Sequence, residues 1–331
     1  MKPVIFGLAG TRLTDDERAL FREAEPVGYI LFRRNIDTPD QVRALNDSLR
    51  DLSGRADLPL LVDQEGGRVQ RLQPPHWMKL PAQQQIGDLE PDVASRAAWL
   101  LGRLIAHDTV GAGFNVPCAP CLDLRQPQTH DVIGDRAFSS DPDRVAALGA
   151  QVVAGLRAGG ALPVVKHLPG HGRATSDSHL DLPVIDCGID DLKHTDFRPF
   201  RRLARQAAFG MTGHLLFPAI DKHHPSTLSP VVIGEVIRMF CNFDGFLMSD
   251  DIDMKALPGT AAERAVGSLD AGCDGVLQCS GDLATMREVA EAVPEIGEQA
   301  RARLSLAMAT LQRPEAFDAA AGLAELEDLL A

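Results

Sequence analysis

The feature that most constrains the fold of this chain is a series of short apolar runs that recur from one end to the other. Their apolar residues are continuous instead of alternating with polar ones, a pattern typical of strands buried on both faces of a parallel sheet. Eight such runs lie along the 331 residues, at 4–9, 28–32, 58–63, 114–117, 162–167, 210–214, 245–249 and 275–278. They predict eight parallel strands that helices cover on the outside.

Segments of helical periodicity separate these runs, and their starts carry N-cap chemistry. Thr14 with Glu17 has the spacing of a capping box, and Thr38, Asp141 and Ser229 each precede a proline. We expect helices over 39–52, 93–111, 142–159, 197–207, 230–240, 261–270 and 283–292, and a helical, amphipathic tail over 298–330.

Strands that alternate with helices predict an α/β fold, a single (β/α)8 barrel of TIM type with a C-terminal helical tail. A doubly wound open sheet is the alternative, but no G-x-G-x-x-G fingerprint follows the first strand. No linker or internal repeat marks a second domain. We therefore expect one domain over 1–331, with a barrel core over about 1–280 and terminal helices over 281–331.

Composition excludes several classes of partner. The formal net charge of −13 argues against nucleic acids and anionic membrane surfaces, which need a basic face. No apolar stretch is long enough to span a membrane, and no signal-peptide cleavage site follows the first apolar run. The six cysteines sit mostly in apolar runs, as buried free thiols do. We expect a cytoplasmic monomer that binds a small molecule.

Polar side chains interrupt the apolar runs at the carboxyl ends of four predicted strands. These ends read DQEGGR at 63–68, KHLPGHG at 166–172, TGH at 212–214 and SDD at 249–251. Active sites of barrels lie at the carboxyl ends of the strands, so we expect these segments to share one site.

Two of these segments contain candidate catalytic groups. In KHLPGHGRATSDSHLDLP, Asp177 and His179 are two residues apart, so an extended loop would place them on the same side. A carboxylate beside an imidazole orients the ring and raises its pKa, which makes a proton shuttle near neutral pH. In FLMSDDIDM, Asp250, Asp251 and Asp253 are candidate nucleophiles or bases, and the pattern alone does not choose among them.

At these residues the chain resembles glycoside hydrolase family 3, and within it the bacterial β-N-acetylglucosaminidases (β-hexosaminidases) of peptidoglycan recycling. The KHxPGHG…DSH string is highly specific to that family, although Leu168 replaces its usual Phe. The resemblance runs to about residue 280 and also rests on AGTRLTDDE, GYILFRRNI, VDQEGGRVQRL, NVPCAPCLDL, HDVIGDRAFSSDP, MTGHLLFPAID and LMSDDIDM.

The resemblance implies a role for each matching position. It makes Asp250 the nucleophile and His179 the general acid/base, with Asp177 polarising the imidazole. It implies retaining removal of terminal β-linked N-acetylglucosamine from muropeptides that contain 1,6-anhydromuramic acid, through a covalent glycosyl–aspartate and without a metal or cofactor. The family's sugar-binding positions match Asp63, Arg71, Arg136, Lys166 and His167.

Several alternatives stay open. The glycosyl unit could pass to phosphate instead of water, or the chain could be another family 3 glycosidase or a non-catalytic sugar-binding protein. A metal-dependent barrel hydrolase would draw its ligands from His130, His167, His171, His179 and His214. Cys118 and Cys121 have the spacing of half a zinc site, but no second half follows. One Tyr and two Trp offer few stacking platforms, which favours a pocket for one terminal sugar.

Overall fold

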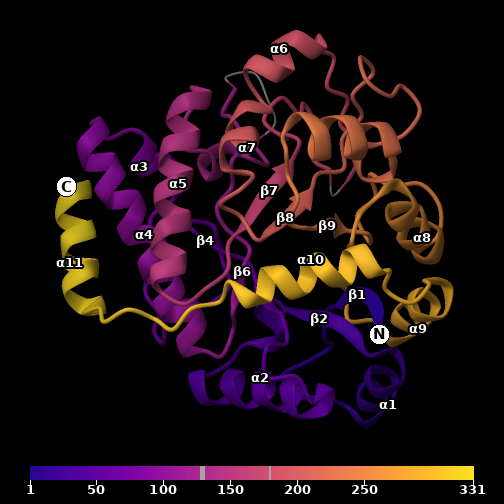
Figure 1. Ribbon diagram of the computed structural model, residues 1–331. Helices are drawn as coiled ribbons and strands as arrows, with labels where there is room; N and C mark the ends of the chain where they lie inside the picture. The colour runs from indigo at the N-terminus through magenta and orange to yellow at the C-terminus, as the bar shows by residue number, and fades with distance from the viewer. Residues whose placement is uncertain (127–130, 179) are drawn as a thin grey trace.

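The computed structural model describes residues 1–126, 131–178 and 180–331, and its main sheet is a ring of parallel strands (Figure 1). The strand order is β6-β3-β2-β1-β10-β9-β8-β7. Beyond β6, Cys121 forms a parallel bridge with Lys166, and Leu122 N donates to Lys166 O at 2.8 Å, which closes the ring. The bounds are β1 (Lys2–Phe6), β2 (Pro26–Leu31), β3 (Leu60–Val62), β6 (Val116–Pro117), β7 (Val164–Leu168), β8 (Phe209–Thr212), β9 (Phe246–Asp251) and β10 (Gly275–Gln278). The predicted (β/α)8 barrel is confirmed.

Helices cover the outside of this ring. The predicted N-caps are present: Glu17 N donates to Thr14 Oγ1, and Gln41 N donates to Thr38 Oγ1. The segment expected as a helix from 230 is π-helical over most of its length. The covering helices are α1 (Asp15–Ala24), α2 (Pro39–Ser53), α4 (Pro91–Gly111), α5 (Pro142–Ala158), α6 (Ile189–His194), α7 (Arg198–Leu203), η4 (Val232–Phe240), α8 (Ala261–Ala271) and α9 (Leu283–Ala292).

The apolar core has an inner and an outer part, because both faces of the strands are buried. On β1, Ile5 belongs to the cluster inside the barrel with Leu61 and Met248, whereas Val4 and Phe6 pack outward against helices. Burial on both faces is what the continuous apolar runs predicted. Among the described residues, no helix is both long and apolar enough to cross a membrane.

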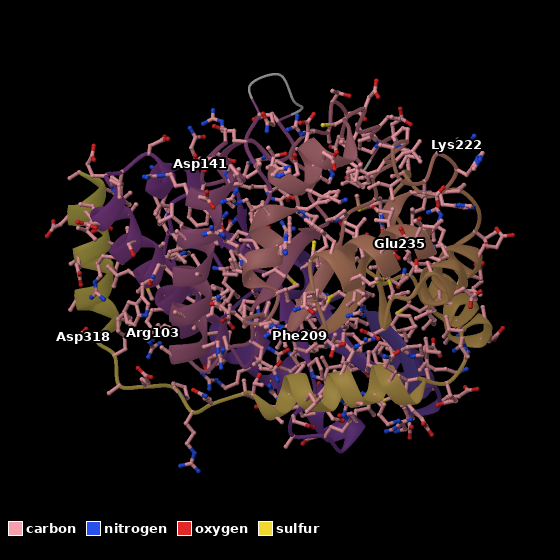
Figure 2. The ribbon with its side chains drawn as sticks, turned by 45° about the horizontal axis from the view of Figure 1, so that its top comes forward. Arg103, Asp141, Phe209, Lys222, Glu235 and Asp318 are labelled. Carbon is pink, nitrogen blue, oxygen red and sulfur yellow. The ribbon has the colours of Figure 1, made fainter. Side chains whose placement is uncertain are left out.

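The C-terminal tail is two helices, so the prediction of one helical segment over 298–330 is wrong between them. Helix α10 (Glu298–Ala309) closes the amino-terminal end of the barrel, and α11 (Ala319–Leu330) packs against α4 (Figure 1). The linker between them contains Pro314, which cannot donate a helical hydrogen bond. Arg103 Nη2 holds the linker by donating to Glu315 O at 2.5 Å (Figure 2).

The sequence did not predict a short hairpin next to β3. Strands β4 (Gln64–Gly66) and β5 (Val69–Gln70) pair antiparallel immediately after the carboxyl end of β3. A short helix, α3 (Gln83–Gly87), follows the hairpin. A Cβ at Gly66 would lie 2.3 Å from Pro81 O, so this turn admits only glycine. The hairpin keeps Glu65 at the mouth of the barrel.

Candidate active site

A cavity of about 420 Å³ lies at the carboxyl ends of the strands. It collects side chains from the ends of β3, β7 and β9 and from the loops that follow them. His179 lies outside the described residues, as does His130. The other residues to which the resemblance gives a role all line this cavity: Asp63, Arg71, Arg136, Lys166, His167, Asp177 and Asp250. His171 and His214, the remaining candidate metal ligands, are not among the lining residues.

Four of the cavity's charged side chains form a buried ion-pair cluster. Lys166 Nζ lies 3.0 Å from Asp63 Oδ1 and 2.6 Å from Glu65 Oε1. Arg136 binds the Glu65 carboxylate through two hydrogen bonds, each 2.9 Å long. The Lys166 and Glu65 side chains are only 2% and 1% exposed, so each charge depends on its partners for solvation. The alternating charges hold these groups in fixed positions around the cavity.

These ion pairs also set the protonation states of the two carboxylates in the cluster. Burial alone would raise the pKa of Glu65, but Arg136 and Lys166 lower it to about 2. Lys166 and Arg71 likewise hold the pKa of Asp63 well below its ordinary value, against the effect of burial. Both carboxylates are therefore ionised at neutral pH. The prediction from sequence left out Glu65, although it stands two residues after Asp63 in DQEGGR, the spacing of residues on one face of a strand.

The loop that carries Arg136 is held by Arg68, which also lines the cavity. Arg68 Nε donates to Asp135 Oδ1 at 2.7 Å, and its Nη2 donates to Asp131 O at 2.5 Å. Arg68 follows β4 in the hairpin, so the hairpin supplies both Glu65, which binds Arg136, and the side chain that binds the Arg136 loop. Arg68 was predicted at a strand end in DQEGGR, but no role was predicted for it.

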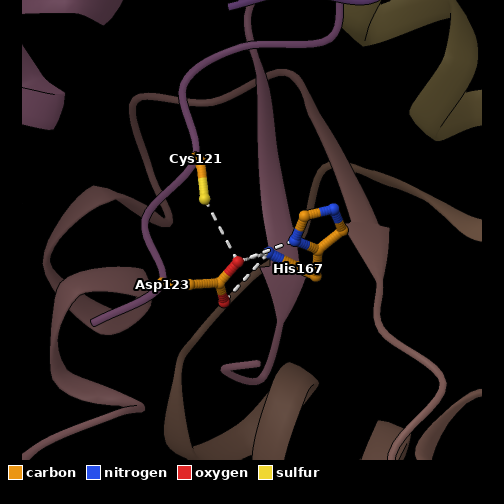
Figure 3. Close-up of side chains that lie close together, drawn as sticks. All are labelled: Cys121, Asp123 and His167. Atoms are coloured by element: carbon orange, nitrogen blue, oxygen red, sulfur yellow. Dashed lines mark hydrogen bonds and ion pairs between the residues drawn. The ribbon is translucent and has the colours of Figure 1, made fainter. Parts of the chain in front are cut away.

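Asp123 orients His167 through the contact drawn in Figure 3, and it is not among the residues that line the cavity. Its Oδ2 lies 2.7 Å from His167 Nδ1, and the carboxylate also accepts the backbone N–H of His167 at 3.2 Å. His167 Nε2 lies 3.3 Å from Arg136 Nη2, on the cavity side. Asp123 was not predicted from the sequence, although it is the one carboxylate in NVPCAPCLDL, just past the fourth predicted strand.

Cys121 joins this group and raises the question of a metal. Cys121, Asp123 and His167 offer ligand atoms within 4.8 Å of one another, the one such group found in the described part of the chain. Zinc would need a thiolate, but burial raises the pKa of the Cys121 thiol well above its ordinary value. The thiol instead donates to Asp123 Oδ2 at 3.2 Å, and that carboxylate already binds N–H groups (Figure 3). The cluster therefore fits a hydrogen-bonded support for His167 better than a metal site.

The end of β9 presents three carboxylates with different surroundings. Asp251 Oδ1 accepts backbone N–H groups from Asp253 and Cys279, both at 3.1 Å, and Asp253 Oδ2 accepts Gln278 Nε2 at 2.8 Å. These bonds use both carboxylates to join the loops after β9 and β10. Burial, with the nearby Asp253 charge, raises the pKa of Asp251 to about 7. Asp250 and Asp251 both line the cavity, whereas Asp253 does not, and Asp250 Oδ1 accepts Asp251 N at 2.8 Å.

His214 supports this strand end. Its Nε2 lies 3.0 Å from Asp251 O, and its Nδ1 lies 2.8 Å from Thr227 Oγ1. The side chain is fully buried and is not among the cavity-lining residues. His214 thus holds the backbone of β9 beside Asp250.

Asp177 reaches the cavity from a turn, so the premise of an extended loop is wrong. Leu180 N and Asp181 N both donate to Asp177 O, at 2.9 and 3.0 Å, which brings the chain back towards Asp177. The Asp177 side chain still lines the same cavity as Asp250 and Lys166. The loop after β7 therefore brings its carboxylate to the strand ends that hold the other groups.

Comparison with known proteins places this arrangement in a family. A model described as the N-terminal domain of glycosyl hydrolase family 3 matches residues 6–313. A β-hexosaminidase of Alkalilimnicola ehrlichii is 42% identical over 284 residues, which cover 84% of this chain and 80% of that relative. The structure of NagZ from Neisseria gonorrhoeae is 31% identical, with a TM-score of 0.88 over 100% of this chain and 98% of that chain. NagZ from the same organism in complex with N-trifluoroacetyl-D-glucosamine is 30% identical, with a TM-score of 0.87 over 99% and 97% of the two chains. The chain therefore belongs to glycosyl hydrolase family 3 and is a glycoside hydrolase of the β-hexosaminidase type.

Proposed function

We propose that this enzyme is a retaining exo-β-N-acetylglucosaminidase that releases terminal N-acetylglucosamine from muropeptides containing 1,6-anhydromuramic acid. Asp250 is the nucleophile, His179 is the general acid/base, and Asp177 polarises and orients His179. The single observation that carries the proposal is the position of Asp250, which lines the same cavity as Asp177 and the Lys166 ion-pair cluster.

The choice of Asp250 among the three carboxylates rests on their surroundings. The carboxylates of Asp251 and Asp253 accept backbone and amide N–H groups that join two loops. Asp251 also has a pKa raised to about 7 by burial, so at neutral pH it is often protonated and a poor nucleophile. Asp250 lines the cavity, and its carboxylate accepts the neighbouring backbone N–H of Asp251 within the same strand end.

The cavity suits a neutral sugar. Asp63 and Glu65 balance Lys166 and Arg136 in close ion pairs, so the cluster has no need of a charged ligand. The same groups remain able to exchange further hydrogen bonds with hydroxyls, as charge-assisted partners. A volume of about 420 Å³ is at the small end of ligand sites and suits one terminal sugar with part of its neighbour. The N-trifluoroacetyl-D-glucosamine bound by the Neisseria relative supports a glucosamine derivative as the ligand.

In the first step, an Asp250 carboxylate oxygen bonds to the anomeric carbon while the bond to the leaving oxygen breaks. His179 gives its proton to that oxygen. In the second step, water attacks the anomeric carbon and loses its proton to His179, and the bond to Asp250 breaks. Two inversions retain the β configuration and regenerate both groups.

The test is activity of the purified protein on aryl β-N-acetylglucosaminides and on matched aryl β-glucosides. We expect turnover of the first substrate, retention by NMR of the product, and no requirement for phosphate. Activity on the glucoside alone would contradict the sugar assignment. A glycosyl phosphate product, formed only when phosphate is added, would replace hydrolysis with phosphorolysis. A muropeptide with a 1,6-anhydromuramic acid residue then tests the natural substrate.

A further inference from the structure

The second histidine of KHLPGHG, His171, has no role in the steps above, yet it is bound to the segment that carries the proposed acid/base. Its Nε2 lies 3.1 Å from Ser178 Oγ. Ser178 stands between Asp177 and His179 in the sequence. His171 and Ser178 are each 2% exposed, whereas Leu180 on the same turn is 68% exposed. The hydrogen bond is thus a buried attachment point in a loop that is otherwise exposed nearby.

His171 is itself firmly held. Its backbone N donates to Asp123 Oδ1 at 2.6 Å, and its ring lies 5.7 Å from the ring of His167 in an edge-to-face arrangement. A Cβ at Gly172 would lie 2.2 Å from Leu124 O, so the turn after His171 sits directly on the neighbouring backbone. Burial lowers the pKa of His171 to about 4, so the ring is neutral near pH 7. A buried, neutral ring whose backbone is anchored to Asp123 is suited to holding a hydroxyl in one place.

We propose that His171 is a positioning residue, which fixes Ser178 and thereby sets Asp177 and the proton donor relative to the sugar. The inference rests on the proposed function, since it takes Asp177 and His179 as the proton-transfer pair. Asp123 gives the arrangement its reference point, because it binds both His167, which lines the cavity, and His171, which holds the loop. Groups that transfer a proton lose much of their effect when displaced by about 1 Å.

The decisive variants remove or restore this one hydrogen bond. His171→Ala and Ser178→Ala each delete a partner. Glutamine carries its amide group about as far from Cα as histidine carries Nε2, so His171→Gln can still reach Ser178. Asparagine reaches only as far as Nδ1, so His171→Asn is the matched variant of similar polarity that cannot.

The readout is kcat/KM on aryl β-N-acetylglucosaminides with a poor leaving group (phenyl) and an activated one (2,4-dinitrophenyl). General acid catalysis is worth ~10²–10⁴-fold, so displacement of the acid should cost roughly 10-fold or more on the phenyl substrate. The dinitrophenyl substrate needs little protonation, and its loss should be only a few-fold. We expect His171→Gln to recover most of the phenyl activity and His171→Asn to recover little. The double variant, His171→Ala with Ser178→Ala, should be about as impaired as either single variant, because each substitution removes the same interaction.

Equal losses on the two substrates, additive losses in the double variant, or equal behaviour of Gln and Asn would each overturn the inference. If the His171 variants fail to fold, as judged by thermal unfolding, Ser178→Ala decides alone by its substrate dependence. Asp177→Asn and His179→Ala are measured beside them. If those two show no leaving-group dependence, the proposed function fails. If they show it and the His171 and Ser178 variants do not, only the role of His171 fails.

Discussion

The two sides of the cavity are held in different ways. On the sugar-binding side, Lys166, Asp63, Glu65 and Arg136 form buried ion pairs that depend on one another. On the side of the loop after β7, a hydrogen bond between two neutral groups attaches Ser178 to His171. A change in the first region leaves a buried charge without its partner, so it should affect stability and binding together. A change in the second should affect proton transfer with little effect on the fold.

The largest effect is expected from Asp250, which belongs to neither region and acts on the sugar directly. Asp250→Ala should reduce turnover by at least ~10⁴-fold, because no covalent intermediate can form. Asp251→Asn is the matched control, since an asparagine oxygen can still accept the N–H groups of Asp253 and Cys279. It should retain most activity.

Mass spectrometry locates the intermediate. An activated 2-deoxy-2-fluoro glycoside should leave an adduct on Asp250 in the otherwise intact enzyme. An adduct on Asp251 or Asp253, or loss of turnover in Asp251→Asn with survival in Asp250→Ala, would reverse the assignment.

The next largest effect tests the ion-pair cluster. Lys166→Met leaves Asp63 and Glu65 without their shared cation, and it should lower the free energy of unfolding by ~3–5 kcal/mol. The comparison is Arg96→Met, which breaks a pair with Glu325 at side chains that are 46% and 42% exposed. An exposed pair contributes no more than ~1 kcal/mol. Urea unfolding measures the free energy of unfolding of both variants. Equal losses would show that the buried ion pairs stabilise the fold no more than an exposed pair does.

A smaller effect on the free energy of unfolding is expected when the pH is lowered. The pKa of Glu65 is lowered from 4.5 to about 2 in the folded protein, so the unfolded chain binds more protons between those values. Stability from this group is present above pH ~4.5, falls as the pH drops towards 2, and amounts to about 3 kcal/mol. Glu65→Gln should therefore make the free energy of unfolding less dependent on pH in that window. Glu327→Gln, at an exposed position, should leave the wild-type slope unchanged.

The sequence predicted the barrel and the strand ends that form the cavity, but it did not predict all the contacts inside the site. The barrel could be predicted from the continuous apolar runs, because strands that are buried on both faces are typical of parallel sheets. The ends of β3, β7 and β9 followed from polar residues that interrupt those runs. Pattern alone did not give the roles of Glu65 and Asp123, because whether a carboxylate faces the cavity, an arginine or a backbone N–H depends on packing between distant segments.

The tail and the loop after β7 show the same limit. Periodicity predicted helix across 310–318, but contacts with Arg103 and Ala158 hold that linker extended. Asp177 was predicted on an extended loop, and hydrogen bonds from Leu180 and Asp181 fold the chain into a turn there. In both places local sequence preference yields to long-range or capping contacts that no single window contains.

The smallest effect is expected at Cys121. Cys121, Asp123 and His167 could form either a hydrogen-bonded support or a metal site, and these two interpretations predict opposite results. If Asp123 is a hydrogen-bonded support for His167, the thiol adds one weak bond to a carboxylate that also binds His167 Nδ1 and two backbone N–H groups. Cys121→Val should then change kcat/KM by less than ~3-fold, because an S–H donor contributes little. Extensive chelation should leave the activity of the purified enzyme intact. The opposite outcome has three parts: chelation abolishes activity, zinc restores it, and zinc does not restore Cys121→Val. In that case the cluster is a metal site, and His167 acts through that metal instead of through Asp123.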